Sequence, residues 1–235
     1  MFVPLHDGVP LRFMRAAYVT YALIAVCIAL YLLIVVGRDE QAQIAIAAGF
    51  GLIPSVLFGT ARLPADIAQL PAWATLVSNV LMHASLAHLA GNMLFLWVFG
   101  DNVEDAMGHW RFLAFFTLCG VAGSVTHAAM NATSDQPLVG GSGAISGVIM
   151  SYLMLYPRVR IWGIAFNWIP LHISALYAIG AWILFQFAAA FLDPEGHVGW
   201  WAHLGGLAAG AALTPLLIHR GMTLFGRARP DPHAS

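Results

Sequence analysis

The sequence predicts an all-α membrane protein, built as a bundle of six transmembrane helices. The chain is 60% hydrophobic and only 9% charged, whereas a soluble domain carries about 25% charged residues. Six apolar segments stand out, and most have the roughly 20 residues that a helix needs to cross about 30 Å of hydrocarbon. Their length and their lack of polar/apolar alternation argue against a transmembrane barrel. The segments are 17–36, 80–99, 112–130, 143–156, 173–192 and 201–219.

The distribution of arginines predicts the orientation. All ten basic residues are arginine, and with a cytoplasmic N-terminus only Arg38 and Arg62 fall outside. This excess of inside charge favours cytoplasmic locations for both termini. The 101–111 connection departs from this pattern, because three acidic residues accompany Arg111 there.

We expect one six-span domain over 1–225, followed by a polar, proline-containing cytoplasmic tail over 226–235 that is disordered. The first apolar run is long and lacks a small-x-small cleavage pattern after it, so it is interpreted as a retained span. The longest connection, 37–79, lies outside. Its apolar stretch 50–58 is too short to span and is expected to lie in the membrane interface, with Trp73 as a nearby anchor.

Composition also narrows the function. A net charge of −1 gives no indication of nucleic-acid binding. Cys27 and Cys119 both lie inside apolar spans and are interpreted as packing residues. The two cysteines are too few and too buried to indicate a metal site. A zinc site from His83, His88 and His203 is an alternative, but its helical spacing is poor and no carboxylate or thiol completes the shell.

Five polar residues are predicted to share one depth in the membrane. Spans two, four and six run in the same direction, so their N-terminal parts lie together in the outer leaflet. Polar groups in hydrocarbon are costly and commonly functional, although span ends are where they cost least. Their shared depth therefore indicates one site, formed by His83, His88, Asn92, Ser142 and His203.

Glycine spacing suggests how two of these spans could meet. Gly143 and Gly147 are four residues apart on span four, and Gly206 and Gly210 are four apart on span six. Small residues at this spacing let helix backbones approach closely. Such contact would bring the Ser142 hydroxyl within reach of the imidazole on span six, although simple packing explains either pair equally well.

A serine and a histidine in contact can hydrolyse a peptide bond. The neutral imidazole of His203 would take the proton of Ser142 as the oxygen attacks a carbonyl, and would then protonate the leaving amine. Such acid–base help is worth about 10²–10⁴-fold. The resulting oxyanion needs donors, for which the Ser142 backbone N–H, the Asn92 amide and the His88 ring are candidates.

The prediction is a Ser–His dyad without an acidic third member. No Asp or Glu falls inside the six predicted spans, and Asp193 and Glu195 lie in the loop before the last span. We therefore expect packing and aromatic contacts to hold the His203 imidazole, which avoids burying a permanent charge.

The residues around the serine have simpler interpretations too. A lone serine in a membrane helix usually bonds the carbonyl four residues earlier, and this is the alternative for Ser142. Ser146, one turn deeper, is interpreted as a packing residue. Gly140 and Gly141 would let the backbone fold closely around the substrate carbonyl.

Taken together, these elements resemble the rhomboid family of intramembrane serine proteases. The resemblance covers most of the chain and depends on three elements that occur in order on the expected spans. They are the Gly140-Gly141-Ser142-Gly143 segment, the His83, His88 and Asn92 pattern, and the final-span His203 followed by Gly206 and Gly210.

The resemblance implies roles for these residues. Ser142 would be the nucleophile and His203 the base, while His88, Asn92 and the Ser142 backbone would form the oxyanion pocket. His83 would be an ancillary histidine near the mouth of the site. The resemblance further implies cleavage of single-span membrane proteins near the outer face, without a cofactor, by a multi-pass protein of the bacterial inner membrane.

Two other classes of function are alternatives to the protease. A non-catalytic relative would bind or escort transmembrane helices, but such relatives usually lack the serine or histidine. A small transporter would be expected to show intramembrane charges and a pseudo-symmetric repeat, and the sequence shows neither. One departure from many relatives is that Ala74, rather than arginine, follows Trp73 in the first external loop.

Overall fold

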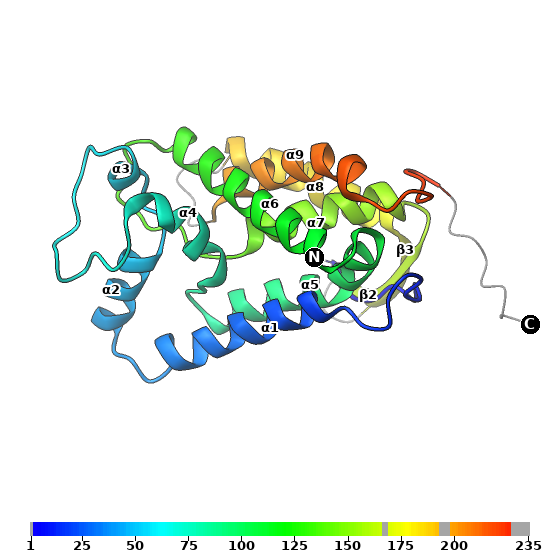
Figure 1. Cartoon of the computed structure of the whole chain (residues 1–235), viewed down its shortest axis with the longest axis horizontal. Coiled ribbons are helices and arrows are strands. Elements are labelled where there is room, and N and C mark those ends of the chain that lie inside the picture. Colours follow the sequence, from blue (N-terminus) through cyan, green and yellow to red (C-terminus); the bar gives the residue numbers. More distant parts are fainter. Residues whose placement is uncertain (1, 166–168, 193–197, 227–235) are drawn as a thin grey trace, which may run out of the picture.

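The computed structural model describes residues 2–165, 169–192 and 198–226 and shows a mostly helical chain (Figure 1). Each of the six predicted segments overlaps a helix of the structure. A short π-helix, η1 (Tyr31–Val35), extends the first of them. The main helices are α1 (Tyr18–Leu30), α5 (Leu86–Met107), α6 (His109–Met130), α7 (Ser142–Leu155), α8 (Ala175–Leu192) and α9 (Trp200–Leu217). Most of the predicted tail, 227–235, lies outside the described residues.

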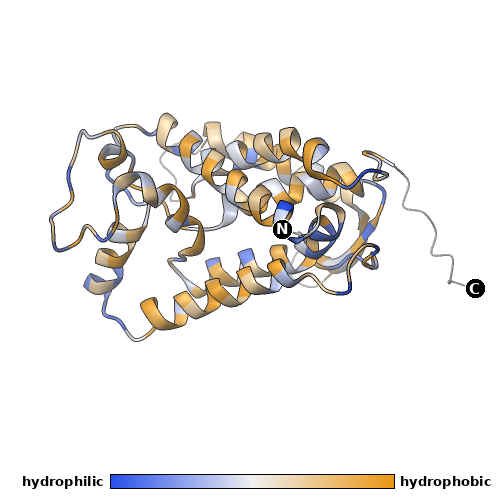
Figure 2. Ribbon diagram, viewed as in Figure 1, coloured by the Kyte–Doolittle hydropathy of each residue, from blue (hydrophilic) through white to orange (hydrophobic). Residues whose placement is uncertain are grey.

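Long apolar helices indicate that this is an integral membrane protein. Among the described residues, α1 with η1, α6 and α8 are each long and apolar enough to cross a bilayer. A fourth crossing is obtained if Ala72–Leu81 and Leu86–Met107, which meet at an angle of 77°, count as one broken span. Helix α1 is coloured mostly as hydrophobic in Figure 2, and large apolar side chains of both α1 and α8 are exposed, as expected for helices that face lipid.

Aromatic side chains fill the centre of the bundle. Phe99 of α5 lies 4.7 Å, ring centre to ring centre, from Tyr152 of α7, a distance typical of favourable aromatic pairs. Phe112 and Phe115 of α6 are fully buried in the same cluster. The core therefore joins α5, α6 and α7, and α9 packs on α6 and α7.

The second predicted span begins later and ends later than 80–99. The chain before it forms the short helices η2 (Ala72–Ala74), α4 (Thr75–Ser78) and η3 (Asn79–Leu81), and then becomes extended at Met82. Helix α5 starts only at Leu86, because the Ser85 hydroxyl accepts the backbone N–H of His88 and caps it. It then continues to Met107, two turns past the predicted end.

The predicted 101–111 connection is therefore wrong, since its acidic residues lie on α5. Glu104 is fully buried and accepts the backbone N–H groups of Val19 and Thr20, at 3.0 and 2.7 Å, and the Thr20 hydroxyl. These N–H groups belong to the first turn of α1, where a carboxylate is favourable. The turn to α6 is made by Gly108 alone, with φ of +85°.

A second buried carboxylate fixes the chain that precedes α1. Asp105 accepts the backbone N–H groups of three consecutive residues, Arg12, Phe13 and Met14, at 2.7–2.9 Å. The acids of α5 therefore act as acceptors for otherwise unpaired N–H groups of the N-terminal segment.

A three-stranded antiparallel sheet makes the all-α prediction incomplete. The strands β1 (Phe2–His6), β2 (Arg160–Ala165) and β3 (Ile169–Ser174) pair in the order β1-β2-β3. The sheet lies at the end of the molecule opposite α2 and α3 (Figure 1). Its strands are short, and its first strand comes from far away in sequence, so no local pattern indicated it.

Asp7, directly after β1, anchors this sheet to the bundle. Its Oδ2 accepts the Asn102 side-chain N–H of α5 and the Tyr152 hydroxyl of α7, at 2.8 and 2.7 Å. Burial raises the pKa of Asp7 above its ordinary value of 3.8.

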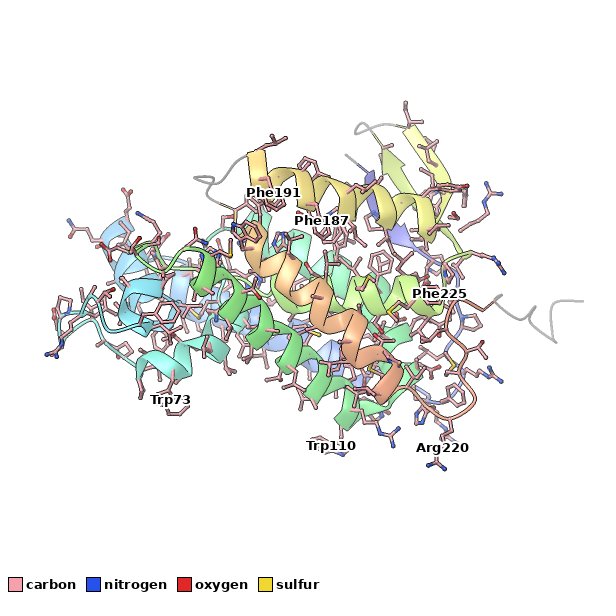
Figure 3. All side chains as sticks on the ribbon, turned by 90° about the horizontal axis from the view of Figure 1, so that it is seen from above. Trp73, Trp110, Phe187, Phe191, Arg220 and Phe225 are labelled. Atoms are coloured by element: carbon pink, nitrogen blue, oxygen red, sulfur yellow. The ribbon has the colours of Figure 1, made fainter. Side chains whose placement is uncertain are left out.

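The long 37–79 connection contains structure that the sequence analysis missed. It includes α2 (Glu40–Phe50) and α3 (Pro54–Leu57). Leu52 is fully buried and pairs with Leu138 through two backbone hydrogen bonds of 3.0 and 2.8 Å. The 50–58 stretch thus packs largely into the protein instead of lying free in the membrane interface. Trp73 is 72% exposed (Figure 3), and its role as an anchor stays a prediction.

We predict that Glu104→Ala destabilises the protein by about 3 kcal/mol or more, because it leaves buried N–H groups of α1 without an acceptor. Thermal unfolding in detergent would measure the change. Glu40→Ala, at an exposed carboxylate in the first turn of α2, should shift stability by no more than about 0.5 kcal/mol. Equal effects of the two substitutions would contradict the capping role.

We also predict that docking of the N-terminal strand depends on pH. Because the pKa of Asp7 is raised when the segment is docked, docking weakens as pH rises from 3.8 through the raised value. Asp7→Asn keeps an acceptor oxygen without the charge. Hydrogen exchange of the β1 amides should therefore be slower in this variant than in wild type at pH 7 and similar near pH 3. A difference of the same size at both pH values would argue against this linkage.

Candidate active site

Helices α7 and α9 meet through glycines without intervening side chains. A Cβ at Gly206 would overlap the carbonyl oxygen of Gly143, and one at Gly210 would lie 2.5 Å from the carbonyl oxygen of Gly147. No larger residue fits these two positions without moving the helices apart. The close approach predicted from the two glycine pairs is confirmed.

This approach brings the predicted serine and histidine together. Ser142 is the first residue of α7 and is half-buried, while His203 lies in the first turn of α9 and is 7% exposed. The His203 Nε2 lies 2.8 Å from the Ser142 Oγ. The alternative for Ser142, a bond from its hydroxyl to the carbonyl four residues earlier, is found instead at Ser146. The Ser146 hydroxyl donates to the Ser142 carbonyl oxygen at 2.7 Å.

Two tryptophans and one glutamine surround the His203 ring. Trp182 of α8 stacks on it with ring centres 6.4 Å apart, and Trp200 meets it edge-on at 5.8 Å. The Oε1 of Gln186, also on α8, lies 3.3 Å from Nδ1. Aromatic contact was expected, but the sequence analysis missed Gln186. The sequence does contain an indication of its importance, because Gln186 is a polar amide inside the apolar 173–192 segment.

The predicted histidine and asparagine residues form a second cluster beside Gly140 and Gly141, which precede Ser142 and form the serine loop. His83 lies in the extended segment before α5, so its predicted placement on the helix is wrong. Its Nε2 nevertheless lies 3.0 Å from the Asn92 Nδ2, and its ring meets that of His88 edge-on at 5.3 Å. The His88 ring in turn lies against Gly140, since a Cβ there would be 2.5 Å from its Cε1.

The backbone before Ser142 is held by a buried asparagine that the sequence analysis did not identify. The Gly140 N–H donates to the Asn79 carbonyl oxygen at 2.9 Å. The Asn79 side chain is itself fixed by a 3.0 Å hydrogen bond to the Ser124 hydroxyl of α6. Gly140 has φ of +138°, and a Cβ on Gly141 would lie 2.9 Å from the Val80 carbonyl. Glycine at both positions is therefore required by this loop.

A cavity of about 200 Å³ borders the cluster at His83. Its walls come from α2, from Met82 and Ala84, and from Val139 near the serine loop. No group of three or more His, Cys, Asp or Glu side chains that could hold a metal occurs in the part of the chain that the structure describes. Cys27 and Cys119 are buried and unbonded to each other, as their predicted packing role requires.

We predict that Gly206→Ala forces α7 and α9 apart, because the new methyl group would overlap the Gly143 carbonyl. Overpacking of this kind costs about 1–3 kcal/mol, which thermal unfolding in detergent would detect. Gly91→Ala on α5, where the added Cβ meets nothing within 4 Å, is the matched control and should not lower stability. A tolerated Gly206→Ala would mean that the helices are less tightly apposed than this contact indicates.

Comparison with known proteins identifies a matching family and several homologues. The family model described as "Rhomboid domain" matches residues 71–220. The Bacillus subtilis (strain 168) protein "Rhomboid protease GluP" is 33% identical over 141 residues, which cover 60% of this chain and 26% of that protein. "RHOMBOID-like protein 12, mitochondrial" of Arabidopsis thaliana is 28% identical over 167 residues, covering 64% and 48%.

A human homologue matches to a similar extent. "Presenilin-associated rhomboid-like protein, mitochondrial" of Homo sapiens is 32% identical over 152 residues, covering 58% of this chain and 37% of that protein. The chain thus spans only about a quarter to a half of the length of these three relatives.

Proposed function

Because the chain belongs to the rhomboid family, we propose that it is an intramembrane serine endopeptidase that cleaves single-span membrane proteins within or near the bilayer. The main support for the proposal is the 2.8 Å contact between His203 Nε2 and Ser142 Oγ. A nucleophile within hydrogen-bond reach of a general base is the arrangement that covalent catalysis needs. The relative from Bacillus subtilis is named a protease, which further supports it.

The proposed reaction begins with Ser142 and His203. The Ser142 hydroxyl donates its proton to the His203 Nε2 while its oxygen attacks the scissile carbonyl carbon. The resulting imidazolium then protonates the leaving amine, and the acyl group stays on Ser142. Water, deprotonated by the same imidazole, releases the acyl group as a carboxylic acid and restores the serine.

The oxyanion of each tetrahedral intermediate would be stabilised at the start of α7. The Ser142 backbone N–H is one of the unpaired donors of the first helical turn, where the helix dipole also favours negative charge. The His88 ring lies against Gly140, one residue before the Gly141-Ser142 peptide, and is assigned as a second donor. Asn92 is assigned as a third. One of its amide hydrogens can bond His83, and the other is left for the oxyanion.

The membrane arrangement proposed for this site has six spans. The 1–225 domain would cross the bacterial inner membrane six times with both termini cytoplasmic, so that α5, α7 and α9 run inward from the site. The overlap of each predicted span with a helix of the structure and the inside excess of arginine support this topology. Substrate would enter sideways past α8, which has only five buried residues along its 18.

We predict that a serine-directed phosphonate labels the wild-type protein covalently and that Ser142→Ala abolishes the labelling. Ser146→Ala should still be labelled, because the Ser146 hydroxyl donates to the Ser142 carbonyl oxygen, whereas the His203 imidazole contacts the Ser142 hydroxyl. His203→Ala should lose both labelling and cleavage of a model transmembrane substrate while the protein still folds. Labelling is measured by intact-protein mass spectrometry.

The same experiment separates a protease from a non-catalytic relative that only binds transmembrane helices. Such a protein would bind the model substrate but would show no labelling that depends on Ser142. Equal labelling of the Ser142→Ala and Ser146→Ala variants would refute the assignment of the nucleophile.

A further inference from the structure

Helix α8 places a single buried amide beside the histidine of the site. Gln186 is 2% exposed, and the residues around it, from Ala175 to Leu192, are otherwise apolar. An amide in such surroundings is costly unless it is hydrogen-bonded. Among the described residues, its hydrogen-bond partner is the Nδ1 of His203, which lies 3.3 Å from Oε1.

The hydrogen bond to Ser142 determines what Gln186 must do. If the Ser142 hydroxyl donates to Nε2, the neutral imidazole carries its proton on Nδ1. An N–H at Nδ1 needs an acceptor, and the Oε1 of Gln186 is in place to accept it. Without this acceptor, the proton could move to Nε2, where it would prevent the ring from accepting the serine proton.

Starting from the proposed protease function, on which this inference rests, we propose that Gln186 is a positioning residue that fixes the tautomer and orientation of the His203 ring. In soluble serine proteases an aspartate holds the imidazole in the correct tautomer. A neutral amide performs the same task here without placing a carboxylate in hydrocarbon.

A second side chain of α8 supports the same ring. Trp182 lies four residues before Gln186, so the two share one face of the helix. Trp182 stacks on the imidazole at an interplanar angle of 26°, while Gln186 bonds its edge. Because His203 belongs to α9, the orientation of the base depends on how α8 sits against α9.

The test compares two near-isosteric replacements of Gln186. Gln186→Met keeps the length and adds no buried polar group, but it removes the acceptor. We expect kcat for a model transmembrane substrate to fall about 10–100-fold, which is less than the full general-base effect of about 10²–10⁴-fold, because the imidazole remains present and only its tautomer and orientation are disturbed. KM should change by less than about twofold. Gln186→Glu keeps an acceptor oxygen at the same position, protonated or not, and should restore kcat to within about threefold of wild type.

The matched packing control is Ile179→Val, which lies two turns earlier on α8 and is also buried at 4% exposure. It alters the packing of α8 without touching His203, and should leave kcat unchanged. A second readout is the ¹⁵N NMR shift of the His203 ring nitrogens in the whole 235-residue chain. It should show Nδ1 protonated in wild type and a mixture of tautomers in Gln186→Met.

Two results would overturn the positioning role: a Gln186→Met variant with wild-type kcat, or one in which Nδ1 remains fully protonated. Failure of the proposed function looks different, because wild type would then show no cleavage or labelling that depends on Ser142. The NMR comparison decides whether Gln186 sets the His203 tautomer in that case too, since it requires no turnover.

Discussion

The direct contact between the backbones of α7 and α9 is the constraint on which the rest of the structure depends. Ser142 has a short side chain and His203 a ring of fixed reach, so the 2.8 Å contact between them requires the two helix axes to be unusually close. Gly143 and Gly206 provide this closeness. In a membrane, where no hydrophobic effect drives helices together, such van der Waals contact between small residues is a main source of association. The residues that stabilise the bundle therefore also set the geometry of the site.

Hydrocarbon imposes a second constraint, since every polar group inside the bundle needs a partner from the protein. Glu104 supplies acceptors to the start of α1, and Asn79 links the serine loop to α6. His83 and Asn92 bond each other. These contacts fix non-helical backbone segments, namely the chain before α5 and the loop before α7, which helix packing alone would not hold. They explain why α5 can begin late and why the chain before it can stay extended close to the site.

The sequence was sufficient for features that depend on long patterns. Six apolar runs located the helices, and the polar residues at matching ends located Ser142 and His203. The missed features depend on contacts between distant segments. The β1 strand pairs with β2 more than 150 residues later, and Glu104 is satisfied by α1, which its own neighbours do not reveal. The start of α5 depended on a single cap at Ser85, within a stretch whose hydropathy gave no sign of a break.

The proposed role of Gln186 suggests why a base in a membrane would be held from a helix that contributes little to the core. A carboxylate on α7 or α9 would have to be buried in the tightest part of the bundle, where each extra atom separates the helices and each charge is costly. Helix α8 packs less closely, and the exposed Phe187 and Phe191 (Figure 3) show that much of it faces outward. It therefore has room for an amide and an indole directed at His203. In the proposed mechanism, a substrate that passes α8 would contact the helix that orients the base, so entry and catalysis would share one structural element.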